Sequence, residues 1–136
     1  MISIFIHVNN ICIFLNQGNS EHIVHHFHFL SWPDHDVPDS AEKLALFIKA
    51  IRNQFPPNNK NPIVVHCSAG VGRTGTFIAI DQLIQNMHNN DYVDIFGTAY
   101  SLRKNRPLMV FDRKLYIFIY KFILDIIQNK IFWNFE

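Results

Sequence analysis

The chain has 136 residues, of which 49% are hydrophobic and 17% charged, so it is too apolar for a disordered protein and long enough for one modest core. It carries 12 Lys and Arg residues against 11 Asp and Glu residues, and this net charge of +1 gives no reason to expect a nucleic-acid partner. The two cysteines, Cys12 and Cys67, are too few for a disulfide framework, which favours a reducing, cytoplasmic location.

The first quarter of the sequence is typical of short β-strands. Ile2–Val8, Ile11–Leu15 and His22–Leu30 are rich in β-branched and aromatic residues, and we expect each of them to form a strand. Asn16–Ser20 contains glycine and asparagine and predicts a turn. Trp32–Pro38 contains two prolines and therefore predicts a loop.

A helix is predicted directly after this loop. Asp39 is the expected N-cap, because Glu42 follows three residues later in the arrangement of a capping box. Apolar residues then recur at helical spacing, which indicates a helix with one face packed on the core. These residues are Leu44, Phe47, Ile48 and Ile51.

The second half of the sequence predicts one short strand and three further helices. Ile63–His66 is apolar enough to form a central, buried strand. The helices are expected over Thr74–His88, over about Asp94–Asn105 before Pro107, and from near Asp112 onward. The expected core residues are Phe77, Ile80, Ile84 and Met87 on the first of these helices, and Leu115, Phe118, Ile119, Phe122 and Ile126 on the last.

Neither apolar end of the sequence resembles a membrane segment. Met1–Leu15 lacks preceding basic residues and is interrupted by polar side chains, unlike a signal peptide. Leu115–Ile127 contains two charged residues, and no apolar run approaches the roughly 18 residues that a span requires. We therefore expect no membrane span.

The segment between the predicted Ile63–His66 strand and the next helix carries the chemistry. Its four small residues allow the backbone to curl until several N–H groups converge at a helix N-terminus, which makes an anion site suited to phosphate. These residues are Ser68, Ala69, Gly70 and Gly72. Cys67 opens the loop and Arg73 closes it with a guanidinium that can bind two phosphate oxygens. The same positive potential lowers the pKa of a thiol, which predicts a thiolate nucleophile.

A simpler interpretation is a small buried cysteine in a glycine-rich turn, which describes most single cysteines. The functional interpretation is favoured because the glycines, Arg73 and the strand–loop–helix order all occur together. The loop differs from a nucleotide-binding P-loop, because no Gly-Lys-Ser/Thr sequence follows it.

The ten residues His66–Gly75, with the sequence HCSAGVGRTG, resemble the signature of the tyrosine-specific protein phosphatases at every position. Ser31–Pro38 resembles the mobile loop that bears the family's general acid, and Leu102–Val110 resembles the approach to its glutamine loop. The resemblance implies an α/β fold, a mixed sheet flanked by helices. Residues 1–136 would form a single partial domain, the C-terminal half of the catalytic domain.

The resemblance also implies a role for each matching residue. Cys67 would be the nucleophile, Arg73 would stabilise the transition state, and Thr74 would hydrogen-bond the sulfur. His66 would position the loop and tune the thiol, while Asp34 would be the general acid and then the general base. The phosphate would bind in the loop formed by Ser68, Ala69, Gly70, Val71, Gly72 and Arg73. The reaction would need no cofactor or metal, and the substrates would be phosphotyrosine-containing proteins.

Several positions depart from the family pattern. Phe111 and Leu115 stand where the family has glutamines, and Phe111 replaces the residue expected to orient the hydrolytic water. Asp36 stands where the acid loop usually has glycine, a residue that adopts positive φ at little cost. We expect the loop that deepens the family's phosphotyrosine pocket to be absent from the 66 residues before Cys67.

These departures leave three functional hypotheses open. The first is a protein-tyrosine phosphatase that acts through a Cys67 phosphoenzyme, with slowed turnover. The second is a phosphotyrosine-binding pseudophosphatase that retains Cys67 and Arg73 for capture. The third is a folding-defective remnant without activity. A lipid phosphatase is disfavoured because Ser68 and Ala69 stand where basic residues would bind a polyanionic headgroup.

Other residues of the sequence also have side chains suited to a functional role. His22, His26 and His28 fall on one face of a predicted strand and could ligate zinc, but a partly solvated strand face is the favoured interpretation, because no cysteine or carboxylate completes the set. Arg103 and Arg106 are expected to buttress the phosphate loop, with solvated surface charge as the alternative. Trp32 is expected to anchor the acid loop as it closes.

Overall fold

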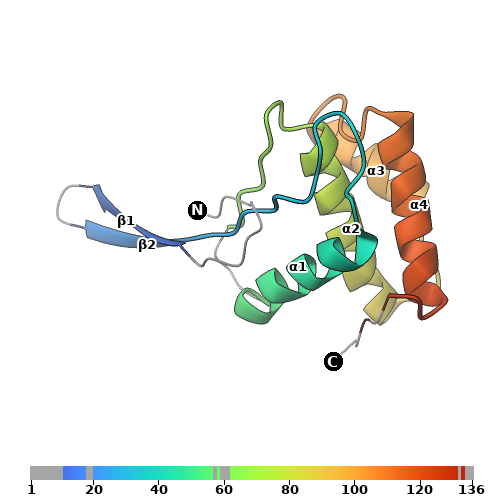
Figure 1. Ribbon diagram of the computed structural model, residues 1–136, viewed down its shortest axis with the longest axis horizontal. Coiled ribbons are helices and arrows are strands. Elements are labelled where there is room, and N and C mark those ends of the chain that lie inside the picture. Colours follow the sequence, from blue (N-terminus) through green and yellow to red (C-terminus); the bar gives the residue numbers. More distant parts are fainter. Residues whose placement is uncertain (1–10, 18–19, 57, 59–61, 132, 134–136) are drawn as a thin grey trace.

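The computed structural model describes residues 11–17, 20–56, 58, 62–131 and 133, with side chains from Val24 onward. The predicted strand Ile2–Val8 lies outside these residues. The order of elements is β1 (Ile11–Gln17), β2 (Ser20–His26), α1 (Ala41–Gln54), α2 (Gly72–Asn89), α3 (Ile95–Asn105) and α4 (Arg113–Ile127). Figure 1 shows a helical body from which a β-hairpin extends to one side.

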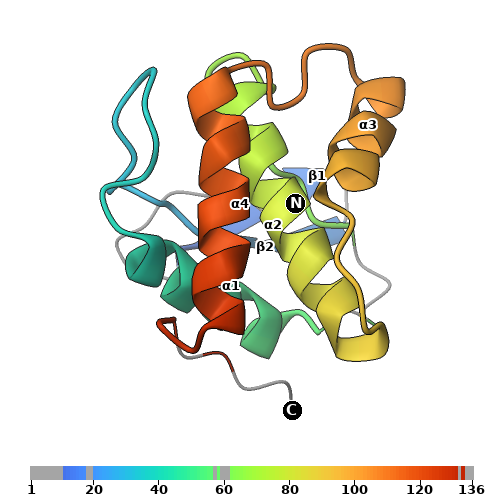
Figure 2. The same ribbon diagram turned by 90° about the vertical axis from the view of Figure 1, so that its right-hand side faces the viewer.

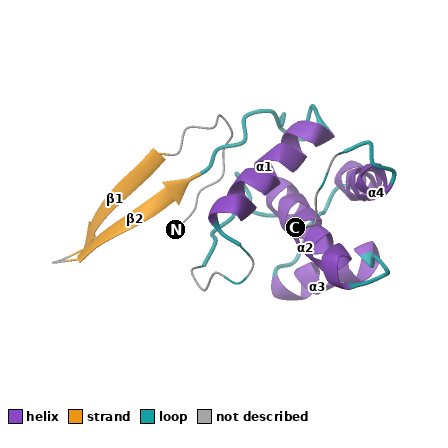
Figure 3. Ribbon diagram, turned by 90° about the horizontal axis from the view of Figure 1, so that it is seen from below, coloured by secondary structure: helices purple, strands orange, loops and turns teal. Residues whose placement is uncertain are grey.

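The hairpin contains all of the strand structure in the described part of the chain. β1 and β2 pair antiparallel, with Ile11 opposite His26 and Gln17 opposite Ser20. This confirms the strand predicted from Ile11 and the beginning of the strand predicted from His22, which ends at His26 and not at Leu30. Figure 3 shows the two strands lying apart from the four helices.

The predicted mixed sheet is not confirmed, and the prediction that Ile63–His66 is a buried strand is wrong. This segment is extended but has no strand partner among the described residues. The side chain of Val64 is 38% exposed, and His66 is exposed as well. A central strand requires neighbours on both edges to satisfy its N–H and C=O groups, and the residues described here supply none.

The start of α1 differs by one residue from the predicted capping box. The N-cap is Ser40, whose hydroxyl oxygen accepts a hydrogen bond from the Lys43 amide at 3.1 Å and donates one to Glu42 Oε2 at 2.7 Å. Asp39 instead donates its backbone N–H to the Ser31 carbonyl at 3.1 Å. Ser40 therefore caps the helix, while Asp39 closes the base of the preceding loop.

The remaining helices confirm the predictions closely. α2 begins two residues earlier than predicted, at Gly72, because Gly72 and Arg73 already form its first turn. The N-caps of α3 and α4 are Asp94 and Asp112, and each carboxylate accepts a backbone N–H of the first turn. Within the described residues, no helix combines the length and apolar character needed to cross a membrane.

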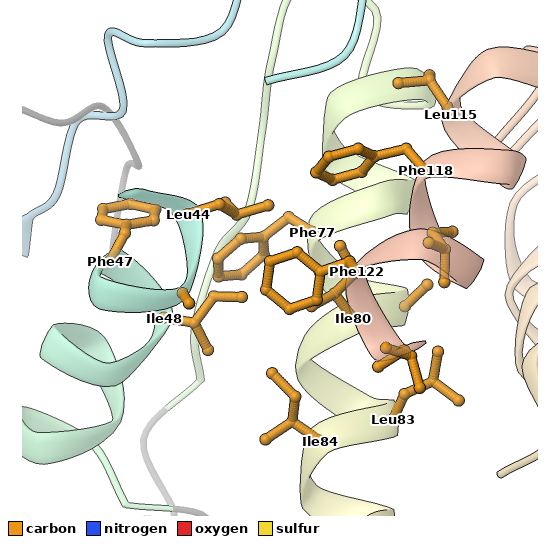
Figure 4. Close-up of a cluster of buried hydrophobic side chains, with 14 of the residues drawn as sticks. Leu44, Phe47, Ile48, Phe77, Ile80, Leu83, Ile84, Leu115, Phe118 and Phe122 are labelled. Atoms are coloured by element: carbon orange, nitrogen blue, oxygen red, sulfur yellow. The ribbon is translucent and has the colours of Figure 1, made fainter. Parts of the chain in front are cut away.

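The hydrophobic core lies between α1, α2 and α4. Figure 2 shows α4 running alongside α2, and Figure 4 shows side chains of the three helices meeting between them. The predicted core residues of these helices are buried, except Met87, which is partly buried. The least exposed large side chains include Leu44, Ile48, Ile51, Ile80, Leu83, Ile119 and Phe122. Because α2 lies between α1 and α4, its position, and that of the loop at its N-terminus, is fixed from both sides.

One ion pair connects α1 to α2 inside this body. Arg52 Nε donates to Asp81 Oδ1 at 2.7 Å, and Arg52 Nη2 pairs with Asp81 Oδ2, so the contact is bidentate. Gln85 Nε2 donates to the same carboxylate at 2.9 Å, and Asp81 is buried. The pair adds a charged contact to the apolar packing of α1 on α2, and its loss would leave a buried, unpaired carboxylate, which is costly.

We expect Arg52→Ala to lower the free energy of unfolding by about 2–3 kcal/mol, because Asp81 would remain buried without its guanidinium partner. The control is Lys43→Ala on the exposed face of the same helix, expected to change it by less than about 0.5 kcal/mol. Urea unfolding followed by circular dichroism measures both. Equal effects of the two substitutions would show that the Arg52–Asp81 pair contributes no more to the free energy of unfolding than an exposed lysine does.

Candidate active site

The loop from Cys67 to Val71 connects the extended Ile63–His66 segment to the N-terminus of α2. Gly70 has a φ of +69°, a conformation that L side chains rarely adopt. No side chain caps the helix, because its N-cap is Val71. The first-turn N–H groups of α2 are thus not taken by a side-chain cap. That they form an anion site remains a prediction.

The sulfur of Cys67 lies at the centre of these donors. Cys67 Sγ accepts hydrogen bonds from the Thr74 hydroxyl at 3.1 Å and from the Gly70 amide at 3.3 Å. Burial by itself raises the pKa of the thiol, but the Thr74 hydroxyl and the amides of Thr74, Gly70 and Val71 outweigh it, so the pKa lies below its ordinary value. The arrangement therefore favours the thiolate.

Arg73 closes the loop that Cys67 opens, and its guanidinium contacts three other residues. Its Nη2 is 2.5 Å from Asp34 Oδ1 and 3.5 Å from Ser68 Oγ. Its Nη1 is 3.5 Å from the carbonyl oxygen of Trp32. The structure thus brings the predicted acid, Asp34, to the predicted phosphate-binding arginine, although the two are 39 residues apart in sequence.

The Ser31–Pro38 loop is fixed at its base by Trp32. The Trp32 side chain is 7% exposed, lies against Phe29 and Phe118, and donates its Nε1–H to the carbonyl oxygen of Asp36 at 2.8 Å. Asp34 at the tip is 75% exposed. The left-handed backbone conformation falls on His35, with φ of +59°, and not on Asp36. The geometry agrees with the predicted anchoring role of Trp32.

Arg103 in α3 and Arg106 at its C-cap contact the loop and its neighbouring segment from outside. Arg106 Nη2 donates to the carbonyl oxygen of Ala69 at 3.2 Å, and its guanidinium lies beside Gly70. Arg103 donates to the carbonyl oxygens of Met109 and Val110 at 2.9 and 2.8 Å. The buttress prediction is confirmed directly for Arg106, whereas Arg103 acts through the neighbouring segment.

That neighbouring segment reaches the loop through Val110. Its amide donates to the carbonyl oxygen of Val71 at 3.0 Å, and a Cβ at Gly75 would lie 2.7 Å from the same nitrogen. Val110 has a φ of +54°, which is strained for a β-branched residue. The bonds from Arg103 and to Val71 hold this strained position beside the first turn of α2, where only glycine fits.

A model of the protein-tyrosine phosphatase family matches residues 6–125 of the chain. The chain belongs to the protein-tyrosine phosphatase family. It is 52% identical over 119 residues to the mouse receptor-type tyrosine-protein phosphatase eta and 49% identical over 117 residues to the human protein of that name, covering 85% and 84% of this chain. It is also 47% identical over 102 residues, 75% of its length, to the rat phosphatidylinositol phosphatase PTPRQ. The chain spans only 10%, 9% and 4% of the lengths of these relatives.

A cavity of about 100 Å³ adjoins Cys67. Phe111 and Leu115 line it, together with Asp34 and Asp36 of the Ser31–Pro38 loop. The Phe111 ring lies 3.0 Å from where a Cβ on Gly72 would stand. Phe111, at a position where the resemblance led us to expect a glutamine, thus places an apolar ring against the start of α2.

A larger cavity of about 390 Å³ adjoins the other side of Cys67. Its walls are mainly apolar, from the segment before the acid loop, from α1 and from α2. His66 contributes to this cavity, and its predicted role in tuning the thiol remains a prediction, because the pKa-lowering contacts of Cys67 come from Thr74 and the loop amides.

No cluster of three potential metal ligands exists among the described side chains. The side chain of His22 lies outside them. The rings of His26 and His28 are 6.1 Å apart, and burial, together with the charges of His26 and His66, lowers the pKa of His28 to about 4. His28 is therefore disposed to remain neutral.

Sequence reasoning missed one charged residue at this site. Lys114, in the first turn of α4, lines the cavity, and its Nζ is 3.6 Å from Asp36 Oδ1. Two features of the sequence could have indicated this contact. Asp36 stands in place of glycine in the Ser31–Pro38 loop, and Lys114 lies in the segment that departs from the glutamine pattern.

We expect Thr74→Val to raise the pKa of the Cys67 thiol, because the substitution keeps the shape of a buried side chain and removes its hydroxyl donor. In a Cys12→Ser background, alkylation of Cys67 by iodoacetamide at pH 7 should slow by about three- to tenfold, since the lost hydrogen bond stabilised a charged group.

Thr76→Val is the matched control, two residues farther along α2. Thr76 is fully buried, and its hydroxyl oxygen has no hydrogen-bond partner among the described residues. The control should leave the alkylation profile against pH unchanged. A Thr74→Val profile identical to the parent's would contradict the assigned role of this hydroxyl.

Proposed function

We propose that the chain is a protein-tyrosine phosphatase that hydrolyses phosphotyrosine in proteins through a cysteinyl-phosphate intermediate on Cys67. One observation carries the proposal: the Cys67 sulfur accepts hydrogen bonds from Thr74 and Gly70 within the loop that Arg73 closes. A nucleophile surrounded by backbone donors at a helix N-terminus suits a phosphoryl group, which needs both attack and charge stabilisation.

In the first step, the Cys67 thiolate attacks phosphorus as the bond to the tyrosine oxygen breaks. Asp34 in its protonated form gives its proton to that oxygen, and Arg73 and the loop amides stabilise the charge on the phosphoryl oxygens. In the second step, water attacks phosphorus, the S–P bond breaks, and Asp34 takes the proton from water. The Thr74 hydroxyl stabilises the departing thiolate. The products are tyrosine and inorganic phosphate.

These steps use no metal ion and no organic cofactor. They require a reduced Cys67, for which the cytoplasm is the suitable compartment. The partners are phosphotyrosine-containing proteins, with no nucleic acid and no membrane insertion involved.

Phosphotyrosine is favoured over an inositol lipid as substrate, although the rat relative is named as a phosphatidylinositol phosphatase. The two positions that follow the nucleophile are Ser68 and Ala69, neither of which offers a cation to additional phosphates. Phosphotyrosine peptide and short-chain phosphatidylinositol phosphate, assayed side by side, distinguish the two substrate classes through their kcat/KM ratio.

A phosphotyrosine-binding pseudophosphatase is the alternative, and the Phe111 ring is the observation that favours it. The ring lies against Gly72, at the position of a residue that would orient the hydrolytic water. Phosphate capture depends on the loop and Arg73, which this chain retains, whereas breakdown of the phosphoenzyme also depends on placing a water.

The direct test is hydrolysis of para-nitrophenyl phosphate by the purified chain and by its Cys67→Ser variant. Turnover that the substitution reduces by at least about 1,000-fold supports the enzyme, since the nucleophile carries most of the rate enhancement. Phosphopeptide binding without turnover supports the pseudophosphatase. Turnover that survives in Cys67→Ser, or neither binding nor turnover in a folded chain, contradicts both.

Phe111→Gln tests the origin of slow turnover. We expect a burst of para-nitrophenol followed by a slow steady state in the parent chain, and a steady-state rate increased by about tenfold in the variant, because water orientation contributes to the second step only. Rapid-quench kinetics separates the two phases. A parent without a burst, or a variant whose burst phase alone accelerates, would exclude rate-limiting breakdown.

A further inference from the structure

A second ion pair crosses the mouth of the Cys67 cavity. Asp36 Oδ1 in the acid loop is 3.6 Å from Lys114 Nζ in the first turn of α4, and both residues line the cavity. The pair therefore joins the acid loop to the wall of the pocket opposite it.

The Asp36 carboxylate is oriented by its own loop. Its Oδ1 accepts the backbone N–H of Val37 at 2.9 Å, and its carbonyl oxygen accepts the Nε1–H of the buried Trp32 at 2.8 Å. The charged oxygen is thus held on the same side of the loop as Lys114, which reduces the rotamer freedom lost when the pair forms.

Lys114 occupies a position that helix stability does not explain. The first turn of α4 contains no acidic residue, and a cation near a helix N-terminus is opposed by the helix dipole. The backbone N–H of Lys114 is bound by the cap, Asp112, at 2.6 Å, so its side chain is free to extend toward the cavity. The opposing charge of Asp36 offsets the unfavourable location of this cation.

The pair gains importance when a phosphate binds. In the structure, the loop acid Asp34 is paired with Arg73, and this contact holds the loop over Cys67. A phosphate bound by Arg73 competes for the same guanidinium and removes that contact. The Asp36–Lys114 pair does not involve Arg73, so displacement of Asp34 from Arg73 does not itself break it.

We propose that Asp36 and Lys114 are positioning residues, forming a latch that keeps the acid loop closed over Cys67 after phosphate has displaced Asp34 from Arg73. The inference rests on the proposed function of the site. Its basis is the Asp36–Lys114 contact across the cavity together with the separate engagement of Arg73. Because glycine is usual at the position of Asp36, the latch distinguishes this chain from the family pattern.

A double-mutant cycle of Asp36→Asn and Lys114→Gln tests the latch. Asparagine retains an oxygen acceptor for the Val37 amide, so the substitution removes only the charge. Lys130→Gln is the matched control, because Lys130 Nζ is likewise 3.6 Å from an aspartate, Asp125, at the opposite end of α4.

The first readout is the rate at which iodoacetamide alkylates Cys67 in a Cys12→Ser, Asp34→Ala background, which removes the Asp34–Arg73 contact as a bound phosphate would. The pH is one where the thiol is fully ionised, so that the rate reports access alone. We expect each single variant to react about two- to fivefold faster than the parent, the range for an exposed ion pair. The double variant should be no faster than either single one, and Lys130→Gln should match the parent. The reversed pair Asp36→Lys with Lys114→Asp should restore the slow rate.

The second readout is catalysis. Each single variant should lower kcat for para-nitrophenyl phosphate by the same factor while changing KM less, because the latch holds the acid and not the phosphate. Alkylation rates equal to the parent's, or additive effects of the two substitutions, would overturn the latch. If the parent shows no turnover and does not bind tungstate, an oxyanion analogue of phosphate, the proposed function fails. The alkylation rates of the four chains then still show whether the Asp36–Lys114 latch exists.

Discussion

The hydrogen bonds to the Cys67 sulfur are the interaction on which the site depends, and their positions follow from the packing of α2. Thr74 and the loop amides can surround the sulfur only if the N-terminus of α2 stands directly behind the loop. That helix is held between α1 and α4 by the hydrophobic core and by the Arg52–Asp81 pair. Gly75, where a Cβ would meet the Val110 amide, allows the segment before α4 to close on the first turn. The hydrophobic packing of the body thus determines the electrostatics of the thiol.

The second organising feature is the distribution of charge around Arg73. The net charge of the chain is only +1, so the positive potential is local, produced by the guanidiniums of Arg73 and Arg106, the helix N-terminus and Lys114. Asp34 and Asp36 pair with Arg73 and Lys114 respectively. These contacts are exposed, and each contributes little to stability. Their consequence is instead the position of the acid loop, which a bound phosphate can change by competing for Arg73.

The sequence predicted the helices, and the turn from Cys67 into the N-terminus of α2, well because their determinants are local. Helical spacing of Leu44, Phe47 and Ile48, and the small residues between Cys67 and Arg73, specify structure over a few residues. Local patterns could not show whether the predicted mixed sheet would form. Ile63–His66 has the composition of a buried strand, yet strand formation needs partners elsewhere in the sequence. The Asp34–Arg73 and Asp36–Lys114 pairs likewise join distant segments, and no periodic pattern in the sequence predicts such contacts.

The central claim is that Cys67 becomes phosphorylated, and the most direct measurement is mass spectrometry of the chain quenched in acid during reaction with para-nitrophenyl phosphate. The account predicts a phosphate adduct that maps to the peptide containing Cys67, accumulates because Phe111 slows the attack of water, and disappears in Cys67→Ser. Hydrolysis without any adduct on Cys67, or an adduct of equal amount on the Cys67→Ser chain, would contradict it.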